Sequence, residues 1–215
     1  MSGFFITLEG GEGSGKTTQC KRLVEWLERE GYDVVTCRDP GTSTGGLAIR
    51  ELLVRGEGDR WLPMSEVLLF NAARYDVVNR VVKPSLEKGA VVIYDRFCDS
   101  TYVYQGYGRG MPLEDLLTIQ ELVVGDCMPD LTLVFDVDAE TALSRSKGGS
   151  LGEDRFENIG REFHTRIQKG YHDLVKQNPQ RCVLVNAMQP YDDVTRDMIA
   201  AVESRLTQKQ EVGVA

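Results

Sequence analysis

The first segment with recognisable chemistry is rich in glycine and lies near the N-terminus. Gly10, Gly15, Lys16 and Thr17 match the pattern G-x-x-x-x-G-K-[ST], between an apolar run and a helical pattern. Glycines let the backbone turn sharply and direct its N–H groups inward, and the helix N-terminus that follows adds partial positive charge. Lysine and threonine at these positions suit outer phosphates and Mg²⁺, and the flanking elements argue against a chance match. The predicted phosphate loop comprises Gly10, Gly11, Glu12, Gly13, Ser14, Gly15, Lys16, Thr17 and Thr18.

A second candidate follows the continuous apolar run at residues 90–94, where Asp95 and Arg96 come next in the chain. A strand that ends in Asp can hold a Mg²⁺-bound water beside a phosphate loop. The planar fork of an arginine at the next position can clamp two phosphates. The spacing alone fits a solvated turn pair equally well, and it is the phosphate loop in the same chain that favours nucleotide binding.

A third candidate is the pair Phe70 and Arg74, which stand four residues apart and therefore share one helix face. An aromatic ring and a guanidinium one turn later can stack on a base and hydrogen-bond its edge. The pair alone is better explained by a core phenylalanine and a surface arginine, because helices commonly combine such faces.

The fourth candidate is a glycine-rich segment at residues 145–155, in which cations flank flexible positions between two helical patterns. Such a segment suits a small lid, about residues 145–157, that brings charge to a transferring phosphoryl group and expels water. The candidate cations are Arg145, Lys147 and Arg155. An exposed connector with ordinary solvated charges is the alternative.

These candidates need a fold that brings the ends of several strands together. Apolar runs predict five strands, at residues 4–9, 33–37, 90–94, 131–137 and 182–185. Helical patterns lie between and after them, at residues 20–27, 47–53, 64–83 with Pro84 kinking or interrupting the pattern, 100–105, 113–124, from about 140, 156–176 and 191–206, with a loop at 106–110. This alternation predicts an α/β fold, with a five-stranded parallel sheet and helices on both faces. Ligands in such sheets bind at the carboxyl ends of the strands.

Length and composition restrict the class of protein. The 215 residues suffice for one core, so we expect a single domain over residues 1–215. A net charge of −8 argues against nucleic acid as a partner. We find no signal peptide and no apolar run long enough for a bilayer, and five scattered cysteines fit a reducing compartment, so we expect a cytoplasmic protein without membrane contact. His164 and His172 lack the spacing of a metal site, so we expect both on the surface.

Taken together, the motifs resemble thymidylate kinase of the bacterial type, which has a P-loop NTPase fold, over nearly the whole chain. The specific part is the Phe-x-x-x-Arg element with the Ser-Thr…Tyr-Gln-Gly element, because other nucleoside monophosphate kinases share only the phosphate loop and the fold. The matching segments are Glu9-Gly10, Arg38-Asp39-Pro40-Gly41, Phe70-Asn71-Ala72-Ala73-Arg74, Asp95-Arg96-Phe97, Ser100-Thr101, Tyr104-Gln105-Gly106, Gly108-Arg109-Gly110, Pro129-Asp130-Leu131-Thr132-Leu133 and Asp154-Arg155-Phe156-Glu157.

The resemblance implies Mg²⁺-assisted phosphorylation of dTMP to dTDP with ATP, in a homodimer formed through the long helices. ATP would occupy the phosphate loop, and Thr17 and Asp95 would serve Mg²⁺. Phe70 would stack on thymine and Arg74 would bond its O4 edge. The dTMP site as a whole would comprise Glu12, Asp39, Arg50, Phe70, Arg74, Arg96, Ser100 and Gln105.

The resemblance also implies the source of the catalytic cations. One class of these enzymes carries an arginine in the phosphate loop, and this chain has Gly13 at that position. The lid must then provide the cation, which fits Arg145, Lys147 and Arg155 acting beside Lys16 and Arg96. The chain departs from the family pattern at Asp39, where Glu is usual, and at Gly41-Thr42-Ser43, where Gly-Gly-Thr is usual. Its lid is also richer in glycine and poorer in arginine.

Other activities remain as alternatives. The nearest is a nucleoside or nucleoside monophosphate kinase of broader base choice. A GTPase-like switch would need Asn-Lys-x-Asp and Asp-x-x-Gly, and the sequence contains neither. A pure ATP-binding module would have no use for the second site that Phe70 and Arg74 suggest.

Overall fold

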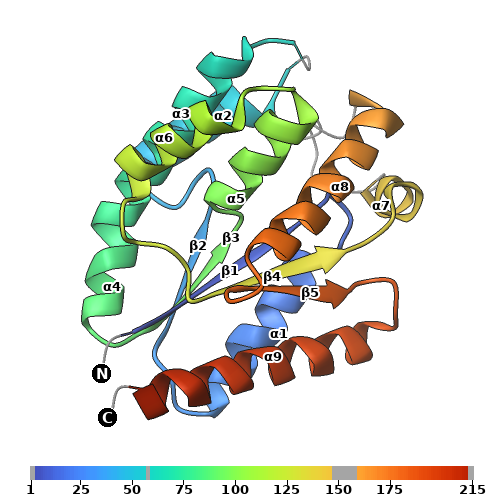
Figure 1. The fold of residues 1–215 in the computed structure, drawn as a ribbon. Coiled ribbons are helices and arrows are strands. Elements are labelled where there is room, and N and C mark those ends of the chain that lie inside the picture. Colours follow the sequence, from blue (N-terminus) through green and yellow to red (C-terminus); the bar gives the residue numbers. More distant parts are fainter. Residues whose placement is uncertain (1–2, 57–58, 147–158, 213–215) are drawn as a thin grey trace.

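The computed structural model describes residues 3–56, 59–146 and 159–212. Its centre is a five-stranded sheet in the order β2-β3-β1-β4-β5, in which every neighbouring pair is parallel (Figure 1). The strands are β1 (Phe4–Gly10), β2 (Val34–Arg38), β3 (Val91–Asp95), β4 (Leu131–Asp136) and β5 (Cys182–Asn186). The predicted α/β fold with five parallel strands is confirmed, and the phosphate loop leaves the sheet at its central strand.

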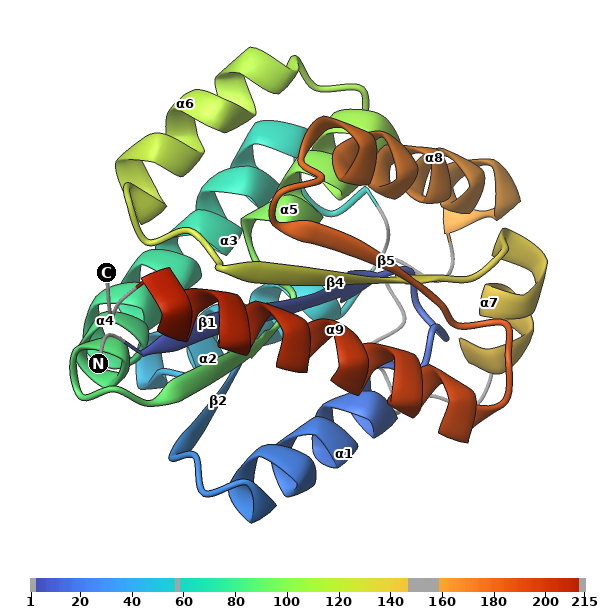
Figure 2. The ribbon, with the colours of Figure 1, turned by 60° about the horizontal axis from the view of Figure 1, so that its bottom comes forward.

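Helices cover both faces of this sheet, with α1 and α9 on one face and α3, α5, α6 and α8 on the other (Figure 2). The α-helices are α1 (Lys16–Arg29), α2 (Thr44–Val54), α3 (Pro63–Val77), α4 (Lys83–Glu87), α5 (Cys98–Thr101), α6 (Leu113–Val124), α7 (Ala139–Ser146), α8 (Arg161–Gln177) and α9 (Tyr191–Val212). Two π-helical segments, Val78–Val82 and Tyr102–Gly108, continue α3 and α5. No helix in these described ranges is long and apolar enough to cross a membrane.

The central strand shows why the sheet is covered twice. Side chains alternate across a strand, so Ile6 and Leu8 pack with Leu23 of α1, while Phe5 packs on the opposite face with Val77. Burial on both faces explains why β1 reads as a continuous apolar run and not as an alternating one. The same burial holds the end of β1, and with it the phosphate loop, in a fixed position.

The sequence predicts that Pro84 kinks or interrupts the helix, but the structure has consecutive helical segments through this residue. It lies in the first turn of α4, directly after the π-helical segment Val78–Val82. A proline is tolerated in a first turn because the missing N–H has no intrahelical partner there. The π-helical turn before Lys83 therefore lets the helical path continue through Pro84.

Other boundaries differ more modestly. Helical structure continues through Gly108, where a loop is predicted to begin at residue 106, and α9 continues to Val212 instead of ending at residue 206. Helix α8 begins at Arg161 in the described residues. Most of the predicted lid, residues 147–157, lies outside the part of the chain that the structure describes, together with Lys147 and Arg155.

Candidate active site

A cavity of about 630 Å³ lies where the phosphate loop and the loops after β2 and β3 meet. Most of the residues predicted from sequence line it. Those predicted for the phosphate loop and a metal site are Glu12, Gly13, Ser14, Gly15, Lys16, Thr17, Thr18 and Asp95. Those predicted for a second nucleotide and a lid are Asp39, Arg50, Phe70, Arg74, Arg96, Ser100, Gln105 and Arg145. The size is within the range of small-molecule sites.

Glycines in the phosphate loop are required by close backbone approaches. Gly10 has a φ of 136°, and a Cβ there would lie 2.5 Å from the carbonyl oxygen of Phe135. Gly13 has a φ of 68°, and its Cβ would lie 2.3 Å from the carbonyl oxygen of Ala142. Any larger side chain would displace the loop from β4 or α7. An arginine at position 13 would need a different approach of α7.

Lys16 lies folded against the inside of this loop. Its Nζ donates to the carbonyl oxygens of Gly10 (3.0 Å) and Gly11 (2.7 Å) and to Oγ of Ser14 (3.1 Å). Burial and the nearby charge of Arg96 lower the pKa of Lys16 to about 8. The ammonium is thus preorganised beside the cavity that a nucleotide phosphate would enter.

Asp95 ends β3 beside the phosphate loop, as predicted. Its Oδ1 atom is buried and has no hydrogen-bond partner among the described residues. A buried, unsatisfied carboxylate oxygen is costly unless something binds it. Thr17 lines the same cavity, and carboxylate and hydroxyl oxygens are the ligands that Mg²⁺ prefers. The residues present therefore fit a magnesium site completed by phosphate oxygens and water.

Arg96 has an unusual backbone for a residue that carries a side chain. Its φ is 65°, in the left-handed region that favours glycine. This conformation directs the guanidinium toward the phosphate loop, where Nη2 donates to Oε1 of Glu12 over 2.9 Å and Nη1 donates to the carbonyl oxygen of Gly10 over 2.9 Å. Strained residues cluster at functional sites, which supports a role for Arg96 in binding.

Glu12 faces Arg96 across the cavity wall. Burial opposes ionisation of Glu12, but the charges of Arg96 and Lys16 outweigh it and hold the pKa of Glu12 below its ordinary value. The hydroxyl of Tyr104 donates to its other oxygen over 2.6 Å. Glu12 is therefore a carboxylate at neutral pH, and it links the phosphate loop to the segment after β3.

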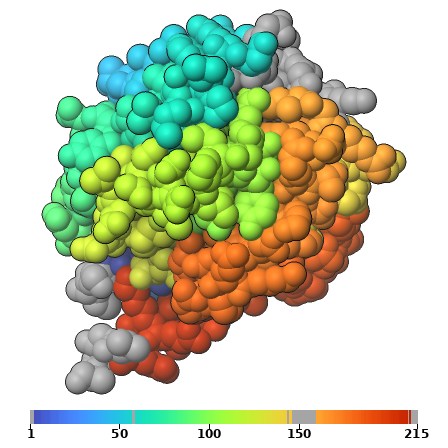
Figure 3. Space-filling model, turned by 45° about the horizontal axis from the view of Figure 1, so that its top comes forward, coloured from blue at the N-terminus to red at the C-terminus, as the bar shows by residue number. Residues whose placement is uncertain are grey.

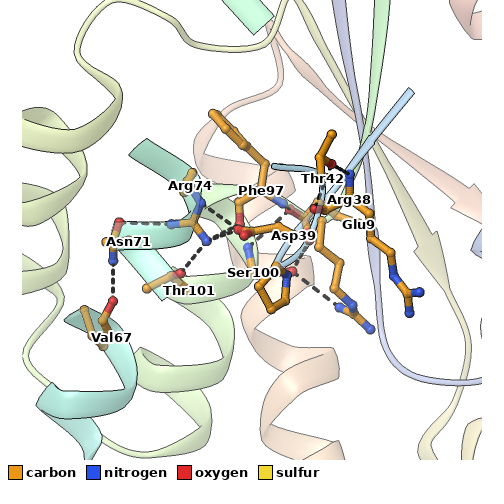
Figure 4. A network of polar contacts seen from close by, with 12 residues as sticks. Glu9, Arg38, Asp39, Thr42, Val67, Asn71, Arg74, Phe97, Ser100 and Thr101 are labelled. Carbon is orange, nitrogen blue, oxygen red and sulfur yellow. Dashed lines mark hydrogen bonds and ion pairs between the residues drawn. The ribbon is translucent and has the colours of Figure 1, made fainter. Parts of the chain in front are cut away.

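Arg74 and Phe70 show the reverse of the burial expected from their spacing. Arg74 is 1% exposed, whereas Phe70 is half-buried and lines the cavity. Figure 4 shows the guanidinium of Arg74 held between Asp39, Asn71 and Thr101. Nε donates to Oδ2 of Asp39 over 2.8 Å, and Nη1 donates to Oδ1 of Asn71 over 3.1 Å. The interpretation as a core phenylalanine and a surface arginine is therefore wrong.

Asp39 reaches Arg74 even though its side chain is shorter than the Glu that the resemblance implies at this position. Burial raises the pKa of Asp39 above its ordinary value, and the charge of Arg74 opposes that rise. Its second oxygen, Oδ1, is buried and has no partner in the described part of the chain. The shorter carboxylate thus satisfies the arginine with one oxygen only.

Several residues to which the sequence reasoning gave no role also build this site. Glu66 is fully buried and accepts from Nε2 of Gln105 over 2.7 Å. It stands four residues before Phe70, on the same helix face, which is the signal that could have identified it. Tyr104 belongs to the Tyr-Gln-Gly element, and the guanidinium of Arg96 lies over its ring, 5.1 Å from the ring centre. The residues added by the structure are Glu9, Arg38, Pro40, Val54, Glu66, Asn71, Thr101, Tyr104, Tyr171 and Tyr191.

The surface prediction for His164 is wrong, because this residue is 4% exposed. It follows Phe163 on α8, and the two rings meet edge to face at 5.7 Å. His172 is half-exposed, with Nε2 lying 2.8 Å from Oδ1 of Asp136. No group of three or more histidines, cysteines or acidic residues arranged for a metal occurs in the described ranges.

Fold and site together define a class of protein. A parallel sheet, a phosphate loop with its lysine, and an adjoining subsite with arginines and an aromatic ring are the parts of a P-loop kinase that acts on a small nucleotide.

Comparison with known proteins identifies the family within this class. The family model described as thymidylate kinase matches residues 8–198. A thymidylate kinase of Caulobacter vibrioides is 47% identical over 204 residues, covering 95% of this chain and 98% of the relative. One of Exiguobacterium sp. is 41% identical over 209 residues, covering 97% of this chain and 98% of the relative. The crystal structure of thymidylate kinase from Ehrlichia chaffeensis superposes with a TM-score of 0.76 at 35% identity, covering 94% of this chain and 99% of that one.

The chain therefore belongs to the thymidylate kinase family, and its reaction is the phosphorylation of dTMP to dTDP. It is a phosphotransferase, and membership of this kinase family implies the use of ATP.

Proposed function

We propose that ATP and dTMP occupy the two halves of this one cavity, with their phosphates meeting between Lys16 and Arg96. The donor phosphates lie against the phosphate loop and the start of α1. The acceptor lies over Phe70, with its base toward Arg74 and its phosphate toward Arg50 and Arg96. The observation that carries this proposal is the convergence of Lys16, Arg74 and Arg96 on one cavity from three separate elements.

The chain's own part in the reaction is positioning and neutralisation of charge, without a covalent intermediate. Lys16 holds the outer donor phosphates, and Arg96 holds the acceptor phosphate so that its oxygen faces the donor. Oε1 of Glu12 accepts a hydrogen bond from Nη2 of Arg96 over 2.9 Å, and this bond keeps the guanidinium oriented. Mg²⁺, held by Thr17 and Asp95, would supply further neutralisation of the charge on the transferring group.

The choice of base rests on the fixed guanidinium of Arg74. Arginine only donates hydrogen bonds, so it pairs with O4 of thymine and leaves the amino group of cytosine facing a cation. Asp39, Asn71 and Thr101 hold Arg74 in one orientation, so that it cannot adapt to the other base. Ser100 and Gln105 lie along the same wall and would contact the base and sugar.

A lid of the bacterial type would complete the site with cations from residues 145–157. The support is Gly13, where a larger side chain would meet Ala142, together with the position of Arg145 at the cavity. The guanidinium of Arg145 donates to the carbonyl oxygen of Ala187 over 3.0 Å, which ties α7 to the loop after β5. Lys147 and Arg155 remain proposals from the sequence.

We also propose a homodimer formed through the long helices. Helices α3 and α6 lie side by side on one face of the molecule (Figure 3). The two helices carry large apolar side chains that are about half exposed, namely Leu68 and Tyr75 on α3 and Leu117 on α6. Exposed apolar groups gathered on neighbouring helices commonly mark an interface. Sedimentation of wild type and of Leu117→Glu tests this interface, and we expect wild type to be a dimer that the substitution weakens.

A cytoplasmic location remains a prediction, which rests on the scattered cysteines of the sequence.

The test of the substrate assignment is a coupled ADP-release assay with dTMP, dUMP, UMP, CMP, AMP and GMP, each with and without Mg²⁺. We expect dTMP to give the highest kcat/KM and activity to depend on Mg²⁺. Equal rates with several bases would instead favour a kinase of broader choice.

A further inference from the structure

Glu9 is a fully buried carboxylate at the end of β1, one residue before the phosphate loop. Its Oε1 accepts from the backbone N–H of Phe97 (2.7 Å) and of Ser100 (3.2 Å). Its Oε2 accepts from the hydroxyls of Ser100 (2.6 Å) and Tyr171 (2.9 Å). One side chain thus joins the central strand to the segment after β3 and to α8.

The first consequence concerns the backbone of Arg96. This residue has a φ of 65°, which is unfavourable for a non-glycine residue and persists only where the surrounding structure fixes it. Its own N–H donates to the carbonyl oxygen of Leu8 over 3.0 Å, and the next N–H, of Phe97, donates to Glu9. Consecutive peptide groups are therefore held by consecutive residues of β1, and this hold keeps Arg96 in its strained conformation.

The second consequence concerns the direction of two hydroxyl groups. A carboxylate can only accept hydrogen bonds, so the hydroxyls of Ser100 and Tyr171 must donate their hydrogens to Glu9. Both oxygens then present lone pairs to Nη1 of Arg96, which lies 3.3 Å from Ser100 Oγ and 3.5 Å from the Tyr171 hydroxyl. The carboxylate of Glu9 thereby makes both hydroxyls acceptors for the guanidinium.

We propose that Glu9 is a positioning residue for the acceptor site, which fixes the backbone of Arg96 and orients the hydroxyls of Ser100 and Tyr171 toward its guanidinium. The inference rests on the proposed role of Arg96 in holding the dTMP phosphate. It adds to that role a residue that touches neither nucleotide, because Glu9 does not line the cavity.

The charged and titratable groups around Glu9 decide the conditions of a test. Burial and the charge of Asp99 raise the pKa of Glu9 to about 7, so a test at pH 8 compares a carboxylate with its variant. Titratable groups from five parts of the chain interact with Glu9: the phosphate loop, the segment between β3 and α5, α5 itself, α8 and β5. They are Lys16, Arg96, Cys98, Asp99, Tyr171 and Cys182.

The test is Glu9→Gln, which keeps the size of the side chain and one acceptor oxygen for the two N–H groups. Its amide would donate to Ser100 and Tyr171, which turns their hydrogens toward Arg96. We expect the KM for dTMP to rise about tenfold at pH 8, with the KM for ATP within about twofold. The melting temperature should stay at or above that of wild type, because a buried charge has been removed.

Asp99→Asn is the matched control, since Asp99 is also a buried acid in the same segment but pairs with Arg181 over 2.7 and 2.8 Å, away from the cavity. We expect it to lower the melting temperature and to leave the KM for dTMP unchanged. Tyr171→Phe removes one hydroxyl only and should raise the KM for dTMP about threefold. This second variant keeps the test decisive if Glu9→Gln does not fold.

Two results would overturn the inference. One is a KM for dTMP within about twofold of wild type in both Glu9→Gln and Tyr171→Phe. The other is a melting temperature of Glu9→Gln that falls as far as that of Asp99→Asn, together with equal rises in the KM for dTMP and for ATP. That result would show that Glu9 has only a structural role. Arg96→Ala separates the two proposals. If it leaves the KM for dTMP unchanged, the role of Arg96 fails; if it raises that KM and Glu9→Gln does not, only the role of Glu9 fails.

Discussion

Arg74 Nε donates to Oδ2 of Asp39 over 2.8 Å, and the side chains of both residues are almost completely buried, at 1% and 2% exposure. Two opposite charges removed from water are stable only as a pair, because either one alone pays the cost of desolvation. The pair joins the loop after β2 to α3, and it sets the direction of the guanidinium that we assign to the base. Stability and base choice are therefore coupled through one contact.

Replacement of Asp39 by Asn tests the cost of that contact. The substitution leaves the charge of Arg74 buried without its counter-ion, so we expect the free energy of unfolding to fall by about 3 kcal/mol. Urea denaturation of wild type and variant measures it. Asp192→Asn is the matched control, because Asp192 forms an exposed ion pair with Arg22 and its loss should leave the midpoint unchanged. Equal midpoints for Asp39→Asn and wild type would contradict the account of the pair.

Lys16→Met tests the phosphate loop. Methionine keeps the apolar stem but removes the ammonium that lies 2.7 Å from the carbonyl oxygen of Gly11. We expect kcat to fall by roughly 10³-fold or more while the fold persists, since a preorganised cation at a transferring group contributes several kcal/mol. Steady-state kinetics gives kcat, and the melting temperature shows that the fold is intact. Activity within about tenfold of wild type would count against the assignment.

Much of the fold could be predicted because its signals are local. Periodicity placed α6 at residues 113–124, as observed, and the apolar runs gave all five strands. The glycine pattern predicts the phosphate loop, and the close approach of Gly10 to the carbonyl oxygen of Phe135 shows why the first glycine of the pattern is required. Boundaries failed where the signal is not local, as at Pro84, whose position in a first turn depends on the π-helical turn before it.

The site was less accessible because it depends on partners distant in sequence. Arg74 reads as a surface residue until Asp39, which is 35 residues away, neutralises it in the interior. Glu9 reads as the end of a strand until its contacts with Ser100 and Tyr171 are known. His164 lies beside the apolar stripe of α8, and only the packing of that helix decides whether it is covered. Buried polar groups follow tertiary geometry, which periodicity does not contain.

Arg155→Ala tests the proposed lid. A cation that acts mainly on the transition state should lower kcat far more than it changes the KM for dTMP. We expect a fall in kcat of about 10²-fold or more, measured with both substrates saturating. Arg161→Ala is the matched control, since Arg161 is an exposed arginine at the start of α8 and should have no effect. An effect of Arg155→Ala on KM alone would place this residue in ground-state binding.

The titration of Glu9 should appear in the pH dependence of stability. Its pKa is raised from 4.5 to about 7 in the folded protein, so the folded state binds more protons than the unfolded state between these values. The contribution of Glu9 to the free energy of unfolding is therefore fully present below pH 4.5 and is lost as the pH rises through 7. The loss is about 3 kcal/mol at most. The measurement is the free energy of unfolding at pH 5 and pH 8 for wild type and Glu9→Gln. We expect the free energy of unfolding of Glu9→Gln, relative to that of wild type, to be higher at pH 8 than at pH 5. The same relative value at both pH values would contradict the raised pKa of Glu9.

Base choice is the most specific test of the acceptor site. Thymine offers O4 as an acceptor where cytosine offers an amino donor, and Arg74 can only donate. A buried mispairing of this kind costs a few kcal/mol, so wild type should prefer dTMP over dCMP by roughly 10²-fold or more in kcat/KM. Removal of Arg74 alone would leave Asp39 as an uncompensated buried charge, so the variant to use is the double substitution Asp39→Ala with Arg74→Ala.

We expect the double variant to lose activity with dTMP strongly and with dCMP little, which narrows the ratio between them. Phe70→Ala is the matched comparison, because stacking is indifferent to the base edge, and it should weaken both substrates while preserving the ratio. The measurement is kcat/KM for dTMP and dCMP in wild type and both variants, with melting temperatures to confirm folding. If the dTMP/dCMP ratio of the double variant equals that of wild type, Arg74 does not read the base, and its burial against Asp39 serves the fold alone.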